Sequence, residues 1–192
     1  MGLPQALENW RLPAGITLLT LLVGLLGDHG RVVLRFDRPA IEAGEAWRLV
    51  SGHFTHLGWS HWALNIAGLL LSWYLVGRAF GTRGWLLVIV ASIAAIDLGF
   101  WFAMPGLNWY VGLSGMLHGL IAAGAIGSWP SRRLEAALIG GFVVFKLAYE
   151  IVAGPVPGSA SAAGGNVITE AHLFGAIGGV LAALALRISV KD

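Results

Sequence analysis

The stretch Gly112-Leu113-Ser114-Gly115-Met116-Leu117-His118-Gly119-Leu120-Ile121-Ala122-Ala123 carries small residues at every fourth position of an apolar segment. These residues, Gly115, Gly119 and Ala123, share one face of a helix. Small residues at this spacing let two helices approach closely in lipid, where packing rather than hydrophobic exclusion drives association. The stretch therefore predicts a membrane helix whose small-residue face packs against a second helix.

A matching face occurs near the C-terminus, in Ala171-His172-Leu173-Phe174-Gly175-Ala176-Ile177-Gly178-Gly179. Gly175 and Gly179 form its small-residue stripe. If the two stripes face each other, Ser114 and His172 come within hydrogen-bonding range, because each lies close to a packing glycine. This spatial pairing is the main prediction from the sequence.

The composition indicates an integral membrane protein with one domain, residues 1–192. Of the 192 residues, 57% are hydrophobic and 11% are charged, against about 25% charged in soluble domains; the mean hydropathy is +0.76. A net charge of +2 with scattered arginines does not suggest a nucleic-acid partner. The absence of cysteine excludes disulfides and thiol catalysis.

Apolar segments near the roughly 20 residues needed to cross a bilayer recur along the chain. They predict an all-α membrane protein, a bundle of six transmembrane helices. The first segment has no small-x-small cleavage site before Asp28-His29, so it is read as a retained helix rather than a signal peptide. The predicted spans are 12–27, 60–77, 84–104, 112–129, 134–153 and 170–189.

Basic residues predict the orientation. Outside the first connection, and apart from Lys146 within a predicted span, arginine and lysine occur near the two termini and in the second and fourth connections. This distribution makes that face, and both termini, cytoplasmic. The opposite connections at 105–111 and 154–169 contain neither residue. The first connection, 28–59, is amphipathic and is predicted to lie in the membrane interface. The connection at 154–169 is predicted to be mobile and to act as a gate.

Ser114 and His172 have the chemistry of an activated nucleophile and its base. Ser114 is flanked by glycines at a loop-to-helix junction, which leaves its hydroxyl uncrowded and backbone N–H groups free. Taken alone, such a serine more often only fills a helix interface. No acidic residue stands at helical spacing from His172, since Glu170 is two residues away and points elsewhere. The sequence therefore predicts a dyad rather than a triad.

His61 and Asn65 are four apart on one face of the second predicted helix. Both can donate hydrogen bonds, so together with the Ser114 backbone N–H they are candidates for stabilising an oxyanion. The alternative is that the two side chains satisfy each other's polar atoms.

These segments, with the earlier Trp47-Arg48 and His56, resemble the rhomboid intramembrane proteases in order and in helix placement. The resemblance covers most of the chain. It implies a Ser114–His172 dyad, an oxyanion site made by His61, Asn65 and the Ser114 backbone N–H, and cleavage of a single-span substrate near the outer leaflet.

Within that family, the chain resembles the rhombosortase branch in three features. They are the six-helix size, the run from Gly112 to Gly119, and the pair Lys146 and Glu150 ahead of Glu170-Ala171-His172. This resemblance implies a multi-pass protein of the bacterial inner membrane, with its active site opening to the periplasmic face. The implied partner is a membrane-anchored surface protein whose C-terminal tail contains a Gly-Gly motif, a transmembrane helix and a basic cluster.

Several other polar residues are expected to support the site. His118 stands where many rhomboids have tyrosine, and its ring is expected to stack on His172. The alternatives are that it competes for Ser114 or is only a buried structural residue. Lys146 and Glu150, four apart, are expected to neutralise each other. The alternative is that they contact the substrate or the connection at 154–169. His56 is expected to brace the first connection against the second helix, and Asp97 to accept an interhelical hydrogen bond. The predicted site is completed by His118, His56, Lys146, Glu150, Gly112, Gly115, Gly175 and Gly179, and Asp97 is assigned no role beyond its hydrogen bond.

No metal or cofactor is predicted, because the His53-to-His56 segment has no glutamate to form a zinc-protease motif. Three alternatives to a sorting-tail protease stay open. They are a rhomboid protease of other single-span substrates, an inactive rhomboid-like protein that binds membrane helices, and an ion transporter that uses the histidines and Asp97.

Overall fold

The computed structural model of the protein describes residues 10–189. Its six long helices lie where the sequence predicts membrane helices, and no end differs from the prediction by more than two residues. They are α2 (Arg11–Leu25), α6 (Trp59–Val76), α7 (Thr82–Ala103), α8 (Ser114–Ser128), α9 (Arg133–Ala153) and α11 (Thr169–Ser189).

Three of these helices, α7, α9 and α11, are long and apolar enough to cross a membrane. A fourth span arises if α2 and α3 (Gly27–Leu34), which meet at a bend of 113°, count as one broken span. The other two carry candidate site residues: α8 has only 15 residues, and α6 contains His61 and Asn65 in its first two turns. The predicted helical membrane protein is confirmed, whereas six crossings and cytoplasmic termini stay predictions.

The first connection is a folded platform. It contains α3, strand β1 (Phe36–Asp37), α4 (Arg38–Glu42), α5 (Arg48–Ser51) and the short 3₁₀ helix η1 (Gly52–Phe54). The buried guanidinium of Arg48 holds this platform together by donating to the backbone carbonyls of Val32 and Arg35, at 2.8 and 3.1 Å.

A two-stranded antiparallel sheet interrupts the helical architecture. Strand β1 pairs with β2 (Trp109–Tyr110), with Phe36 opposite Tyr110. The all-α prediction has no place for this pair, because two-residue strands are too short to produce an alternating pattern in the sequence. The sheet ties the platform to the segment that leads into α8.

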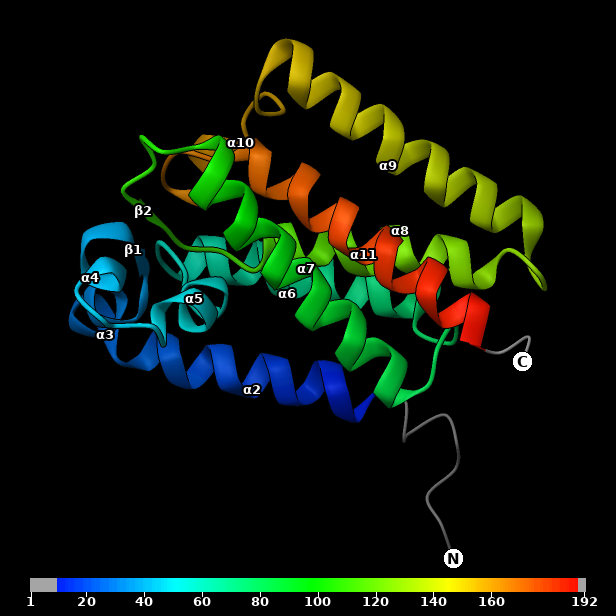
Figure 1. The fold of residues 1–192 in the computed structure, drawn as a ribbon, viewed down its shortest axis with the longest axis horizontal. Helices are drawn as coiled ribbons and strands as arrows, with labels where there is room; N and C mark the ends of the chain where they lie inside the picture. Colours follow the sequence, from blue (N-terminus) through cyan, green and yellow to red (C-terminus); the bar gives the residue numbers. More distant parts are fainter. Residues whose placement is uncertain (1–9, 190–192) are drawn as a thin grey trace, which may run out of the picture.

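Helices α8 and α11 pack at the centre of the bundle through their glycine faces (Figure 1). A Cβ atom added at Gly119 would lie 2.6 Å from the Gly175 carbonyl oxygen, and one at Gly115 would lie 2.8 Å from the Ala171 carbonyl oxygen. Only glycine permits so close a backbone approach. The predicted contact between the two stripes is confirmed.

Helix α9 lies at the edge of the bundle (Figure 1). It rests on α8 and α11 through buried Val143, which packs with Ala122 and Ala176. Large apolar side chains elsewhere on α9, such as Phe145 and Val152, are exposed, as expected of a helix that faces lipid.

Different helix ends and connections lie at the two ends of the bundle. In Figure 1, α2 begins and α11 ends at the same end, where the connections α6–α7 and α8–α9 also lie. The opposite end collects the first turns of α6, α8 and α11 and the last turn of α9. The connection at 154–168 lies there too and contains the short helix α10 (Ser159–Ala163), which contacts α6.

Candidate active site

Ser114 and His172 lie side by side at that end of the bundle. Ser114 is the first residue of α8, and His172 is in the first turn of α11. The Ser114 Oγ is 3.0 Å from the His172 Nε2, although the two residues are 58 positions apart along the chain. The glycine faces of the two helices bring them together, so this predicted juxtaposition is confirmed.

Gly112 turns the chain into α8. Its φ of +145° lies in a region that residues with a side chain rarely adopt. The Tyr110 hydroxyl donates to the Gly112 carbonyl at 2.7 Å, and the Gly112 amide donates to the Gly52 carbonyl at 3.1 Å. Burial raises the pKa of Tyr110, so the phenol stays a neutral donor. This turn determines where α8 begins and therefore determines the position of Ser114, its first residue.

His61 has a defined protonation pattern. The Leu57 backbone N–H donates to its Nδ1 at 3.2 Å, so in the neutral ring the proton is on Nε2. That Nε2 lies beside Gly112, which is two residues before Ser114, because a Cβ at Gly112 would be 3.5 Å from it. His61 can therefore donate a hydrogen bond close to the serine.

Asn65 is buried, and its side-chain amide donates to the His61 backbone carbonyl at 3.0 Å. The bond runs to the backbone and not to the imidazole, so the two side chains do not satisfy each other as the alternative supposed. Both residues line the same cavity as Ser114 and His172.

This cavity has a volume of about 330 Å³. Most of its polar lining lies at the end of the bundle that holds Ser114. A mainly apolar part reaches down between α6 and α9, where Leu71, Ile121 and Phe142 line it. Ser159 and Ala163 of α10 also line it. The cavity therefore suits a bound apolar peptide segment that places one of its backbone carbonyl groups beside the Ser114 hydroxyl.

The His118 ring stacks on the His172 ring, with centroids 4.1 Å apart and planes within 17°. The predicted stacking is confirmed. The His118 Nδ1 is 2.8 Å from the Ser114 backbone carbonyl, to which it donates. His118 thus contacts the backbone of Ser114 and supports the face of His172.

The expectation that no carboxylate reaches His172 is wrong. The Glu150 Oε2 lies 2.9 Å from the His172 Nδ1, while the Glu150 Oε1 accepts from the Lys146 Nζ at 2.6 Å, which confirms the predicted Lys146–Glu150 pair. Spacing along α11 could not reveal this partner, because it comes from α9. The available signal was the presence of two charged residues at membrane depth, which are costly unless they have a role.

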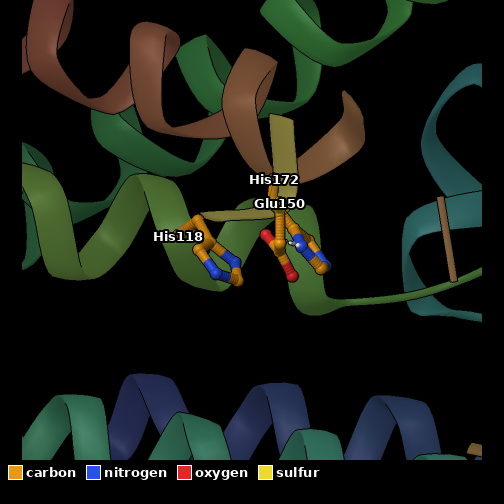
Figure 2. Close-up of side chains that lie close together, drawn as sticks. All are labelled: His118, Glu150 and His172. Atoms are coloured by element: carbon orange, nitrogen blue, oxygen red, sulfur yellow. Dashed lines mark hydrogen bonds and ion pairs between the residues drawn. The ribbon is translucent and has the colours of Figure 1, made fainter. Parts of the chain in front are cut away.

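His118, Glu150 and His172 each have one atom that could bind a metal ion, and these three atoms lie within 4.8 Å of one another (Figure 2). A metal ion would need both ring lone pairs to converge on one point, but the rings are stacked and nearly parallel. Both oxygens of Glu150 already have partners in His172 and Lys146. The cluster fits a hydrogen-bonded array better than a ligand set, and the absence of a metal stays a prediction.

Two further histidines lie behind the site. The His53 Nε2 pairs with the Asp97 Oδ1 at 3.1 Å and so links η1 to α7, which confirms a hydrogen-bonding role for Asp97. The buried His56 ring packs edge-on against His61, with centroids 5.2 Å apart. Burial, and to a lesser degree His61, lowers the pKa of His56 to about 3. A neutral His56 therefore braces the platform against α6, as predicted.

The fold and the site together define a helical integral membrane protein with a serine–histidine pair at one end of its bundle. The family model of the rhomboid domain matches residues 43–189 of the sequence, which is most of the chain. The chain therefore belongs to the rhomboid family. The resemblance seen in the sequence is confirmed at this level, whereas the rhombosortase branch stays a prediction.

The chain is also similar to rhomboid protease GluP of Bacillus subtilis (strain 168). The two are 27% identical over 152 residues, which cover 79% of this chain and 28% of that protein. The chain therefore corresponds to little more than a quarter of its relative's length.

Proposed function

We propose that the protein is an intramembrane serine endopeptidase with Ser114 as nucleophile and His172 as general base. The observation that carries this proposal is the 3.0 Å separation of the Ser114 Oγ and the His172 Nε2 in a cavity between membrane helices. A hydroxyl becomes a useful nucleophile when a positioned base can take its proton. Membership of the rhomboid family supports the same assignment.

In the proposed reaction, His172 takes the Ser114 proton as the Oγ attacks a peptide carbonyl carbon. The negative charge on the resulting tetrahedral oxygen is stabilised by the His61 Nε2–H, the Asn65 amide and the Ser114 backbone N–H. His172 then gives its proton to the leaving amine, and a water molecule hydrolyses the acyl-enzyme by the same two steps. Loss of one oxyanion donor is expected to lower the rate about 10²–10³-fold.

The proposed substrate is a single-span membrane protein. Its helix would enter along the apolar part of the cavity between α6 and α9 and would unwind near Ser114, where small residues such as glycine weaken a helix. Basic residues at the far end of the bundle support a cytoplasmic location for both termini, with the site opening to the periplasmic or outer face of a bacterial inner membrane.

Within this class, we propose that C-terminal sorting tails with a Gly-Gly motif are the preferred substrates. The support is the likeness of the Gly112–Gly119 run and of the Lys146–Glu150 pair to the rhombosortase branch. The alternative is a rhomboid protease that acts on other single-span proteins. The cavity alone would also suit an inactive protein that only binds membrane helices, for which the paired Ser114 and His172 have no use.

Co-expression with two reporters tests the proposal. One reporter carries a Gly-Gly sorting tail and the other a general rhomboid substrate segment. We expect release of the first, no release with Ser114→Ala or His172→Ala, and covalent labelling of Ser114 by a fluorophosphonate probe. Release of both reporters would favour the broader protease, and no release with no labelling would favour the inactive binder. Cleavage that survives loss of Ser114 would refute the proposed mechanism.

A further inference from the structure

A buried carboxylate contacts the imidazole of His172 on the side away from Ser114. Glu150 is 5% exposed, and its Oε2 lies 2.9 Å from Nδ1, while Nε2 lies 3.0 Å from the Ser114 Oγ. Resting on the proposed function, we propose that Glu150 is a positioning residue that fixes the tautomer and orientation of His172. The site is then a serine–histidine–glutamate triad, whereas the sequence alone predicted a serine–histidine dyad.

The hydrogen-bond chemistry determines the tautomer. An ionised carboxylate only accepts, so the proton of a neutral His172 is on Nδ1 and is donated to Glu150. This leaves the lone pair of Nε2 directed at the Ser114 hydroxyl, which is the arrangement that a general base requires. Without Glu150, both tautomers of the ring become accessible.

The placement of the charge supports the same role. Glu150 lies three residues before the end of α9, where the helix dipole is already negative, and at membrane depth, so a carboxylate there is unfavourable on its own. When His172 becomes an imidazolium, it does so in the first turn of α11, at the positive end of that helix's dipole. Glu150 offsets this penalty at the moment the proton moves, so it stabilises the transition state more than the ground state.

Lys146 determines which oxygen of Glu150 faces His172. Its ammonium group only donates and occupies Oε1 at 2.6 Å, which leaves Oε2 for the imidazole. In Glu150→Gln, Lys146 should hold the amide oxygen and so turn the amide NH₂ toward Nδ1. An NH₂ group only donates, so His172 would have to carry its proton on Nε2 and could not accept the proton of Ser114.

The contact between Lys146 and Glu150 predicts that a second substitution will rescue the activity lost by the first. We expect Glu150→Gln to lower kcat at least about 100-fold with little change in KM, because the wrong tautomer blocks chemistry and not binding. Lys146→Met alone should slow cleavage less. Combining Lys146→Met with Glu150→Gln should raise kcat at least about tenfold above Glu150→Gln, since the amide can then rotate and present its oxygen to Nδ1.

The matched control is Glu135→Gln, which makes the same change on α9 at an exposed position where Glu135 pairs with Arg132. It should leave kcat unchanged. Equal loss in Glu150→Gln and in the double variant would mean a merely structural role and would overturn the proposal. So would a kcat for Glu150→Gln within about threefold of the parent. If Ser114→Ala and His172→Ala abolish cleavage in that case, the protease assignment stands and only the role of Glu150 fails.

Nitrogen NMR of the histidine ring gives a readout that needs no substrate. We expect the His172 signal, assigned by its loss in His172→Ala, to report a proton on Nδ1 in the parent. It should report a proton on Nε2 in Glu150→Gln, and on Nδ1 again in the double variant. A parent protein with the proton on Nε2 would refute the positioning role even if no cleavable substrate were at hand.

Discussion

At the scale of single residues, two side chains other than Ser114 support the His172 imidazole, one through a hydrogen bond and one through ring stacking. Glu150 meets the edge of His172 through Nδ1, and the His118 ring covers its face at 4.1 Å. The edge contact selects a tautomer, whereas the face contact restricts tilting of the ring. The two supports are chemically different, so substitutions should separate them.

His118→Phe should retain most of the activity, because a phenyl ring can stack on His172 without any hydrogen bond. His118→Ala should lower cleavage about tenfold, since a poorly oriented base loses part of its contribution to proton transfer. Initial cleavage rates of the two purified variants check the prediction. Complete inactivation of both variants, with normal thermal unfolding, would instead give the His118 hydrogen bond to the Ser114 carbonyl an essential role.

At the scale of helices, the α8–α11 contact determines whether the site exists. These helices meet through glycines, and a Cβ at Gly179 would lie 2.6 Å from the Gly119 carbonyl carbon. The neighbour is backbone and cannot rotate away as a flexible side chain can. Any added atom must therefore push the helices apart, and with them Ser114 and His172.

Gly179→Ala should destabilise the protein by about 1–3 kcal/mol, the usual effect of overpacking. Gly141→Ala on α9 is the matched control, because a Cβ there meets nothing within 4 Å; it should be neutral or slightly stabilising, since alanine favours helix. Thermal unfolding in detergent compares the two. Equal behaviour of both variants would contradict a tight α8–α11 contact.

At the scale of the whole molecule, the bundle separates its chemistry from its basic residues. The candidate site lies at the end that holds the first turns of α8 and α11. Arg78 and Arg132 lie in connections at the other end, where Arg133 begins α9. The positive-inside rule then predicts which end faces the cytoplasm.

The absence of cysteine makes this topology directly measurable. Ser161→Cys and Ser131→Cys are nearly isosteric changes at exposed positions at opposite ends of the bundle. In intact spheroplasts, a membrane-impermeant maleimide should label Ser161→Cys and should label Ser131→Cys only after the membrane is opened. The reverse pattern would invert the predicted orientation, and labelling of both positions in intact cells would contradict opposite sides.

Much of the fold was predictable because it depends on local patterns. Apolar segments bounded by polar connections predicted the positions of all six long helices. Glycines four apart predicted the α8–α11 contact and, through it, the meeting of Ser114 and His172. These features depend on residues within one helix or on two faces of matching shape.

What only the tertiary structure decided is how elements without such a pattern lie against one another. The β1–β2 pair, the folded platform and the rotation of α9 that brings Glu150 to His172 arise from long-range packing. The 21 residues between Glu150 and His172 include a turn rich in glycine and proline, which imposes no fixed angle between α9 and α11. Helical periodicity therefore determined that a serine and a histidine would meet, and tertiary packing decided that a carboxylate would join them.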